Sequence, residues 1–127
     1  MLATVVFTNE VDHWLAKTLR PGFRHVFCAV DHPEHPQAVV YNLTGRGLLS
    51  VASSVYGKAL ALHYRNAGLI ALSVPATPWN RPRGPFTINS CVGLTKQVIG
   101  IESFALTPYQ LYRHLMKEHP SCASSFD

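Results

Sequence analysis

Residues 23–30 read Phe-Arg-His-Val-Phe-Cys-Ala-Val and give a strong strand signal. The run is rich in aromatic and β-branched residues, and a Pro-Gly pair directly precedes it. Because side chains alternate across a strand, the sequence predicts its two faces. One face carries Phe23, His25, Phe27 and Ala29, and the other carries Arg24, Val26, Cys28 and Val30.

Further strands are predicted on either side of this stretch. Residues 31–36 are polar and include two prolines, so they form a loop, and residues 37–43 form a strand that pairs back as a hairpin. Residues 2–8 and 69–74 are largely apolar and form strands, and residues 48–51 are a candidate for a short one.

Four helices are expected from apolar spacing and from capping residues. They cover residues 12–19, residues 53 or 54 to 65, a short helix from Cys91 to the Gly100 stop, and residues 109–119 after the Thr107-Pro108 cap. The second helix is expected to bury Val55, Ala59 and Leu62, with Leu60 as a further candidate. The fold class is therefore α+β, with a small antiparallel sheet packed against helices.

Length and composition favour a single domain. The 127 residues are 47% hydrophobic and 14% charged, which suits a compact chain that spans residues 1–127 with a frayed tail from about residue 120. The net charge of +4 comes from scattered basic residues and gives no strong nucleic-acid signal. Three cysteines without tight spacing do not form a disulfide framework. With no signal peptide and no membrane-spanning run, the expected location is cytoplasmic or intracellular, or inside a virion.

Cys91 is the sharpest candidate for chemistry. Asn89 and Ser90 can cap a helix that Cys91 opens. The free backbone N–H groups and the helix dipole at that position favour thiolate, the nucleophilic form. Alternatively, Cys91 is a small buried apolar residue at the start of a helix, since most free cysteines are buried and unreactive.

A base and an orienting group are available upstream of Cys91. His25 can take the thiol proton and return it to a leaving group, and Asn42 on the next strand can hold the imidazole ring in the right tautomer. Alternatively, His25 is satisfied by a backbone carbonyl and Asn42 starts the turn at Thr44 and Gly45. Asp31 and Glu34 are other possible orienting groups, in a solvated loop.

Other chemistry has weaker support. Cys28, His32 and His35 form a cluster whose spacing matches no common zinc pattern, so neither a metal nor any other cofactor is expected. Motifs of serine hydrolases, nucleotide-binding loops and zinc peptidases are absent from the sequence.

The order of these three segments resembles the circularly permuted branch of the papain-like superfamily, the NlpC-type and lecithin-retinol-acyltransferase-like group. In that group, as in this sequence, a strand that carries a histidine and a following polar residue precede a cysteine at the start of a helix. The resemblance implies a papain-like domain whose sheet packs on the cysteine helix, and thiol-dependent hydrolysis or acyl transfer at an amide, isopeptide or ester bond. Peptide, peptidoglycan or acyl groups are the implied substrates. Carried over, Cys91 is the nucleophile, His25 the base and Asn42 the third member, with Trp79, Tyr41 and Ser90 as substrate-binding candidates.

The second hypothesis is a non-catalytic binding or assembly module, for example a bacteriophage structural or accessory protein. Residues 75–85 hold four prolines together with Trp79, Arg81 and Arg83, and such a loop is a possible contact for a protein partner. A third, weaker hypothesis uses the same three side chains to bind nucleic acid.

Overall fold

The computed structural model describes residues 2–9, 22–44, 47–76, 91–100, 105 and 107–120. The helix predicted over residues 12–19, most of the proline-rich segment and the tail from residue 121 lie outside these ranges, as do Trp79, Arg81, Arg83, Asn89 and Ser90.

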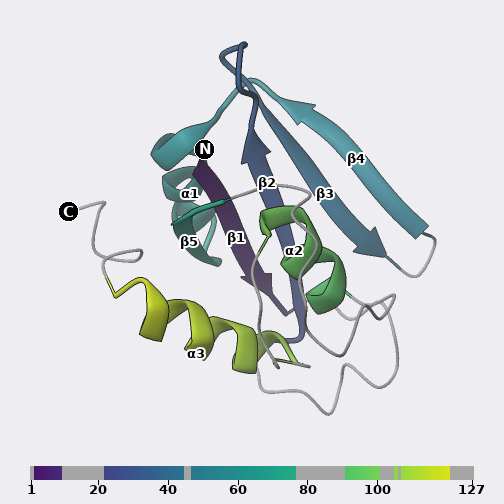
Figure 1. Ribbon diagram of the computed structural model, residues 1–127, viewed down its shortest axis with the longest axis vertical. Coiled ribbons are helices and arrows are strands. Elements are labelled where there is room, and N and C mark those ends of the chain that lie inside the picture. Colours follow the sequence, from purple (N-terminus) through teal and green to yellow (C-terminus); the bar gives the residue numbers. More distant parts are fainter. Residues whose placement is uncertain are drawn as a thin grey trace.

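A five-stranded antiparallel sheet forms the centre of the molecule (Figure 1). Its strands lie in the order β4-β3-β2-β1-β5, and β2 and β3 form the predicted hairpin. The α+β class and the four main strand predictions are confirmed, with bounds shifted by one or two residues. The strands are β1 (Leu2–Thr8), β2 (His25–Asp31), β3 (Ala38–Thr44), β4 (Gly47–Ser53) and β5 (Ile70–Pro75).

Helices cover both faces of the sheet (Figure 1). One face packs against α1 (Gly57–Asn66), which connects β4 at one edge to β5 at the other. The other face packs against α2 (Cys91–Ile99) and α3 (Pro108–Glu118). Two apolar layers therefore form, with the sheet between them.

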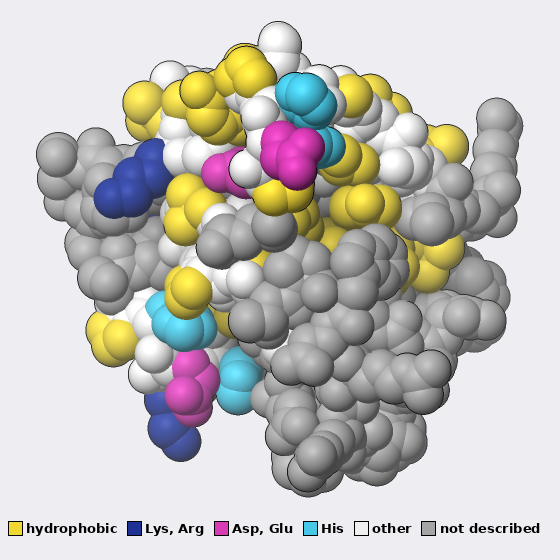
Figure 2. Space-filling view, turned by 45° about the horizontal axis from the view of Figure 1, so that its top comes forward, with side chains coloured by type: hydrophobic (Ala, Val, Ile, Leu, Met, Phe, Trp, Pro, Cys, Tyr) yellow, Lys and Arg dark blue, Asp and Glu magenta, His cyan; other side chains and the backbone are white. Residues whose placement is uncertain are grey.

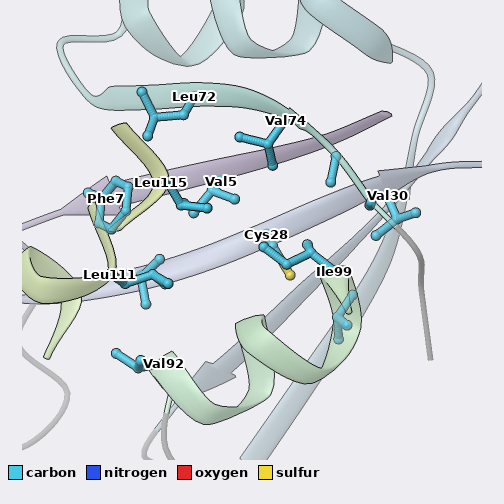
Figure 3. Packing of buried hydrophobic residues seen from close by; sticks show 14 of the residues in the cluster. Val5, Phe7, Cys28, Val30, Leu72, Val74, Val92, Ile99, Leu111 and Leu115 are labelled. Atoms are coloured by element: carbon cyan, nitrogen blue, oxygen red, sulfur yellow. The ribbon is translucent and has the colours of Figure 1, made fainter. Parts of the chain in front are cut away.

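The larger layer lies between the sheet and the pair α2 and α3 (Figure 3). Val5, Phe7, Val26 and Cys28 point from the sheet into this layer, because alternate residues of β1 and β2 share a face. The two strand faces predicted for residues 25–30 are thus observed. The smaller layer lies under α1 and uses the intervening positions, including Val6 and Phe27.

Helix α1 corrects the sequence prediction. It begins at Gly57 because β4 continues to Ser53, whose hydroxyl instead bonds to the backbone of Val55. Of the predicted stripe, Leu60 is buried, but Val55, Ala59 and Leu62 are exposed, and Ala61 is the second buried residue. Val55 precedes the first residue of the helix and so cannot belong to its buried side.

The other helix ends follow the sequence signals. Gly100 adopts a φ of 73°, a left-handed conformation that suits glycine, and it ends α2 as predicted. Thr107 caps α3 in a capping box with Gln110, and Pro108 occupies the first turn. Leu111 and Leu115 are buried on its inner side, and Tyr112 is half-buried.

Candidate functional site

His25 and Asn42 form a hydrogen-bonded pair on the α1 face of the sheet. The ring Nε2 lies 2.6 Å from Asn42 Oδ1, and since this oxygen only accepts, Nε2 carries the donated proton. His25 is 4% exposed, so the bond is largely shielded from water. The sequence predicted this contact, in which an amide fixes the tautomer of an imidazole ring.

Cys91 lies at the first position of α2 and is half-buried. It packs against the layer that contains Val26 and Cys28, on the face of the sheet covered by α2 and α3. The helix start predicted at Cys91 is therefore confirmed. Its role as a nucleophile stays a prediction.

The sheet separates Cys91 from His25. On β2, His25 shares its side with Phe27 and points toward the α1 face, whereas Val26 and Cys28 point toward α2. The pairing of Thr8 with His25 continues the same register, so no bulge turns the ring around. The structure thus brings His25 to Asn42 but not to Cys91.

Cys28 is a buried residue of the core, with a thiol that points toward α2 (Figure 3). Burial raises its pKa to about 12, and the side chain of Thr95 offsets part of that effect. This thiol stays protonated at neutral pH and is a poor nucleophile or metal ligand.

His32 and His35 lie in the exposed loop after β2, apart from Cys28. The Nδ1 atom of His32 accepts hydrogen bonds from the backbone N–H groups of Glu34 and His35, so it organises the turn. Among the described residues, no group of three potential metal ligands is close enough to hold an ion.

Asp31 has a structural contact rather than one to His25. Its Oδ1 accepts a hydrogen bond of 2.9 Å from the backbone N–H of Gly57, the first residue of α1. Glu34 is exposed in the loop. Of the substrate-binding candidates, Tyr41 packs against the core layer under α2, and Trp79 and Ser90 lie outside the described residues.

One buried basic side chain has no signal in the sequence pattern. Lys96 on α2 is 4% exposed, and its Nζ donates a 2.9 Å hydrogen bond to the carbonyl oxygen of Ala105. Burial lowers the pKa of this amine. The bond links α2 to the segment before α3, and its geometry indicates a structural role.

A small pocket lies at the ends of β1 and β5. Phe7, Thr8, Asn9 and Ile70 are among its lining residues, and none of the side chains lining it titrates. It therefore offers no group for acid, base or metal chemistry.

Among the described residues, the two most exposed large hydrophobic side chains lie on β4. Leu49 and Val51 are 53% and 62% exposed, and Ser50 and Ala52, on the opposite side of the strand, are exposed as well. We call these four residues the β4 surface. Figure 2 shows hydrophobic side chains gathered over the upper part of the molecule, around a small group of acidic and histidine side chains. The sequence pattern predicted only a short strand at residues 48–51 and gave no sign of this exposure.

The chain matches no protein-family model, and comparisons with curated proteins and with solved structures found no significant similarity. None of the helices in the described ranges is long and apolar enough to cross a membrane.

Proposed function

We propose that this protein is a non-catalytic binding or assembly module that contacts its partner through the β4 surface. The observation that carries the proposal is the exposure of Leu49 and Val51 on a strand at the edge of the sheet. Exposed apolar side chains beside an open strand edge are typical of sites where another chain adds a strand.

The placement of the polar residues supports the same proposal. A thiol hydrolase of the Cys-His-Asn kind needs His25 within hydrogen-bond reach of Cys91. The two residues lie on opposite faces of the sheet, and Asp31 is engaged at the start of α1. The remaining pair, His25 and Asn42, is satisfied internally, as expected of a buried structural contact.

Thiol hydrolysis is the second candidate, and the bond between His25 and Asn42 is the observation that favours it. Alkylation of Cys91, followed residue by residue by mass spectrometry, separates the two candidates. If the protein is a non-catalytic module, the alkylation rate of Cys91 is expected to be the same in the wild type and in His25→Gln at every pH. A fall of about tenfold or more near neutral pH in a folded His25→Gln protein overturns the proposal.

Complementation of a strain that lacks the protein tests the module directly. Cys91→Ser is expected to restore the protein's role, whereas Val51→Lys is expected to fail because it places charge on the β4 surface. Leu62→Lys is the matched control, since Leu62 is 43% exposed but lies on α1. Restoration by Val51→Lys, or failure of a folded Cys91→Ser, contradicts the proposal.

A further inference from the structure

The β4 edge lacks the features that usually prevent strands from pairing with other chains. Among the strands that the structure describes, β4 pairs with β3 alone. Its sequence, GLLSVAS, contains no charged residue and no proline, and its seven residues run with continuous pairing from Gly47 to Ser53. Natural sheets usually protect such edges with lysine, proline or a bulge. In Figure 1, β4 lies on the side of the sheet away from α1 and α3.

The sequence of β4 is also complementary to itself. If two copies pair antiparallel about a two-fold axis at Ser50, each Leu49 lies directly across from Val51 of the second copy. Both side chains lie on the same side of the strand, because β4 pairs Leu49 with Asn42 and Val51 with Val40. Two leucine–valine pairs then cover apolar surface that is exposed in the single chain.

Charge does not oppose pairing at the strand itself, because β4 carries no charged side chain. The chain carries a net charge of +4, so two copies repel each other at long range. Within Gly47–Ser53, however, the pairing brings no charged side chains together. A contact between identical patches closes into a dimer.

We infer that the occupant of the β4 surface is a second copy of this chain, paired antiparallel through β4 in a register centred on Ser50. The inference rests on the proposed function and names the partner. The joined strands extend one sheet across both copies. Such a contact is small, so the dimer is expected to form reversibly and to depend on protein concentration.

Sedimentation of the full chain over a range of concentrations tests the dimer. The wild type is expected to associate reversibly. Val51→Lys is expected to raise the dissociation constant at least about tenfold, because it sets a charged group against the apolar Leu49 of the second copy. Leu62→Lys adds the same charge to α1 and is expected to leave association unchanged. A wild type that remains monomeric, or equal effects of the two lysine variants, overturns the inference.

Disulfide trapping tests the register, in a background where Cys91 and Cys122, the third cysteine of the sequence, are replaced by alanine. Ser50→Cys places two thiols on Cα atoms about 5 Å apart, within reach of a disulfide, so mild oxidation is expected to give a covalent dimer. Ala52→Cys shifts the two thiols apart by roughly 13 Å along the strands and is expected to remain uncross-linked. Cross-linking of Ala52→Cys but not Ser50→Cys overturns the register.

Failure of this inference and failure of the proposed function have different signatures. A monomeric protein whose role is lost in Val51→Lys but not in Leu62→Lys is a module with another partner, and only the dimer is then wrong. A Cys91 whose alkylation depends on His25 overturns the proposed function whether or not the chain dimerises.

Discussion

Cys28 couples the stability of the molecule to alkaline pH. Its pKa is about 12 in the folded protein, whereas an exposed thiol titrates near 9. Because burial raises this pKa, the contribution of Cys28 to stability is fully present below about pH 9 and is lost as the pH rises toward about 12. Within that window the loss approaches about 1.4 kcal/mol per pH unit.

Denaturant unfolding of the wild type and Cys28→Ala at several pH values above neutrality checks this prediction. The difference between the two free energies of unfolding is the relevant quantity, because it cancels the titration of lysines and tyrosines. Cys28→Ala should be less stable at neutral pH and should lose less stability as the pH rises. Parallel pH profiles for the two proteins would contradict the prediction.

His25 and Asn42 are predicted to act as a structural pair. Replacing Asn42 with alanine removes the acceptor of a largely buried N–H group and is expected to cost about 1–3 kcal/mol. A double-mutant cycle with His25→Phe and Asn42→Ala, followed by urea unfolding, should show that the double variant costs less than the sum of the single ones. Additive losses would mean that the contact contributes little to stability.

At the scale of elements, Asp31 is predicted to fix the start of α1. The side chain of Tyr56, the N-cap residue of this helix, makes no capping hydrogen bond. Instead, Asp31 at the end of β2 accepts a hydrogen bond from the backbone N–H of Gly57. Asp31→Ala is expected to lower stability by about 1 kcal/mol, and Asp31→Asn by less because it retains an acceptor oxygen. Glu34→Ala, in the exposed loop, is the control. Thermal unfolding of the three variants measures the effect, and equal losses in all of them would refute it.

Helix α1 also shows where sequence patterns were insufficient. Apolar residues between Val55 and Leu62 fit more than one helical stripe, so the choice depended on where the helix begins. That start is fixed by the length of β4 and by the hydrogen bond that Asp31, a residue far away in sequence, accepts from Gly57. By contrast, Thr107-Pro108 and Gly100 are local signals, and both helix ends were predicted correctly.

On the scale of the whole molecule, the sheet should insulate its two apolar layers from each other. Val6 belongs to the layer under α1, whereas Cys28 and Ile99 belong to the layer under α2. Ile99→Val is expected to cost about 0.5–1.5 kcal/mol. When Ile99→Val is combined with Val6→Ala, the two losses of stability should add. When it is combined with Cys28→Ala they should not add, because Ile99 and Cys28 lie in the same layer. Denaturant unfolding of the single and double variants tests this, and coupling across the sheet stronger than within the layer would contradict it.

The same layering explains what the sequence could predict about the candidate site. Alternation along β2 correctly separated His25 from Cys28, and the contact between His25 and Asn42 follows from neighbouring strands. Alternation does not tell which helix covers which face. Helix α1 crosses one face from β4 to β5, and α2 packs on the other, so the position of Cys91 relative to His25 depended on the complete topology.

The central position of β1 has a consequence for the order of folding. β1 precedes the other described strands in sequence, yet it lies between β2 and β5, and Leu2 pairs with Pro75. The strands β1 to β4 can assemble as successive neighbours, whereas β5 must close a long loop before it adds to β1. During synthesis, one side of β1 therefore lacks its partner until residue 75 has left the ribosome. We expect this closure to limit the folding rate, since contacts distant in sequence form slowly.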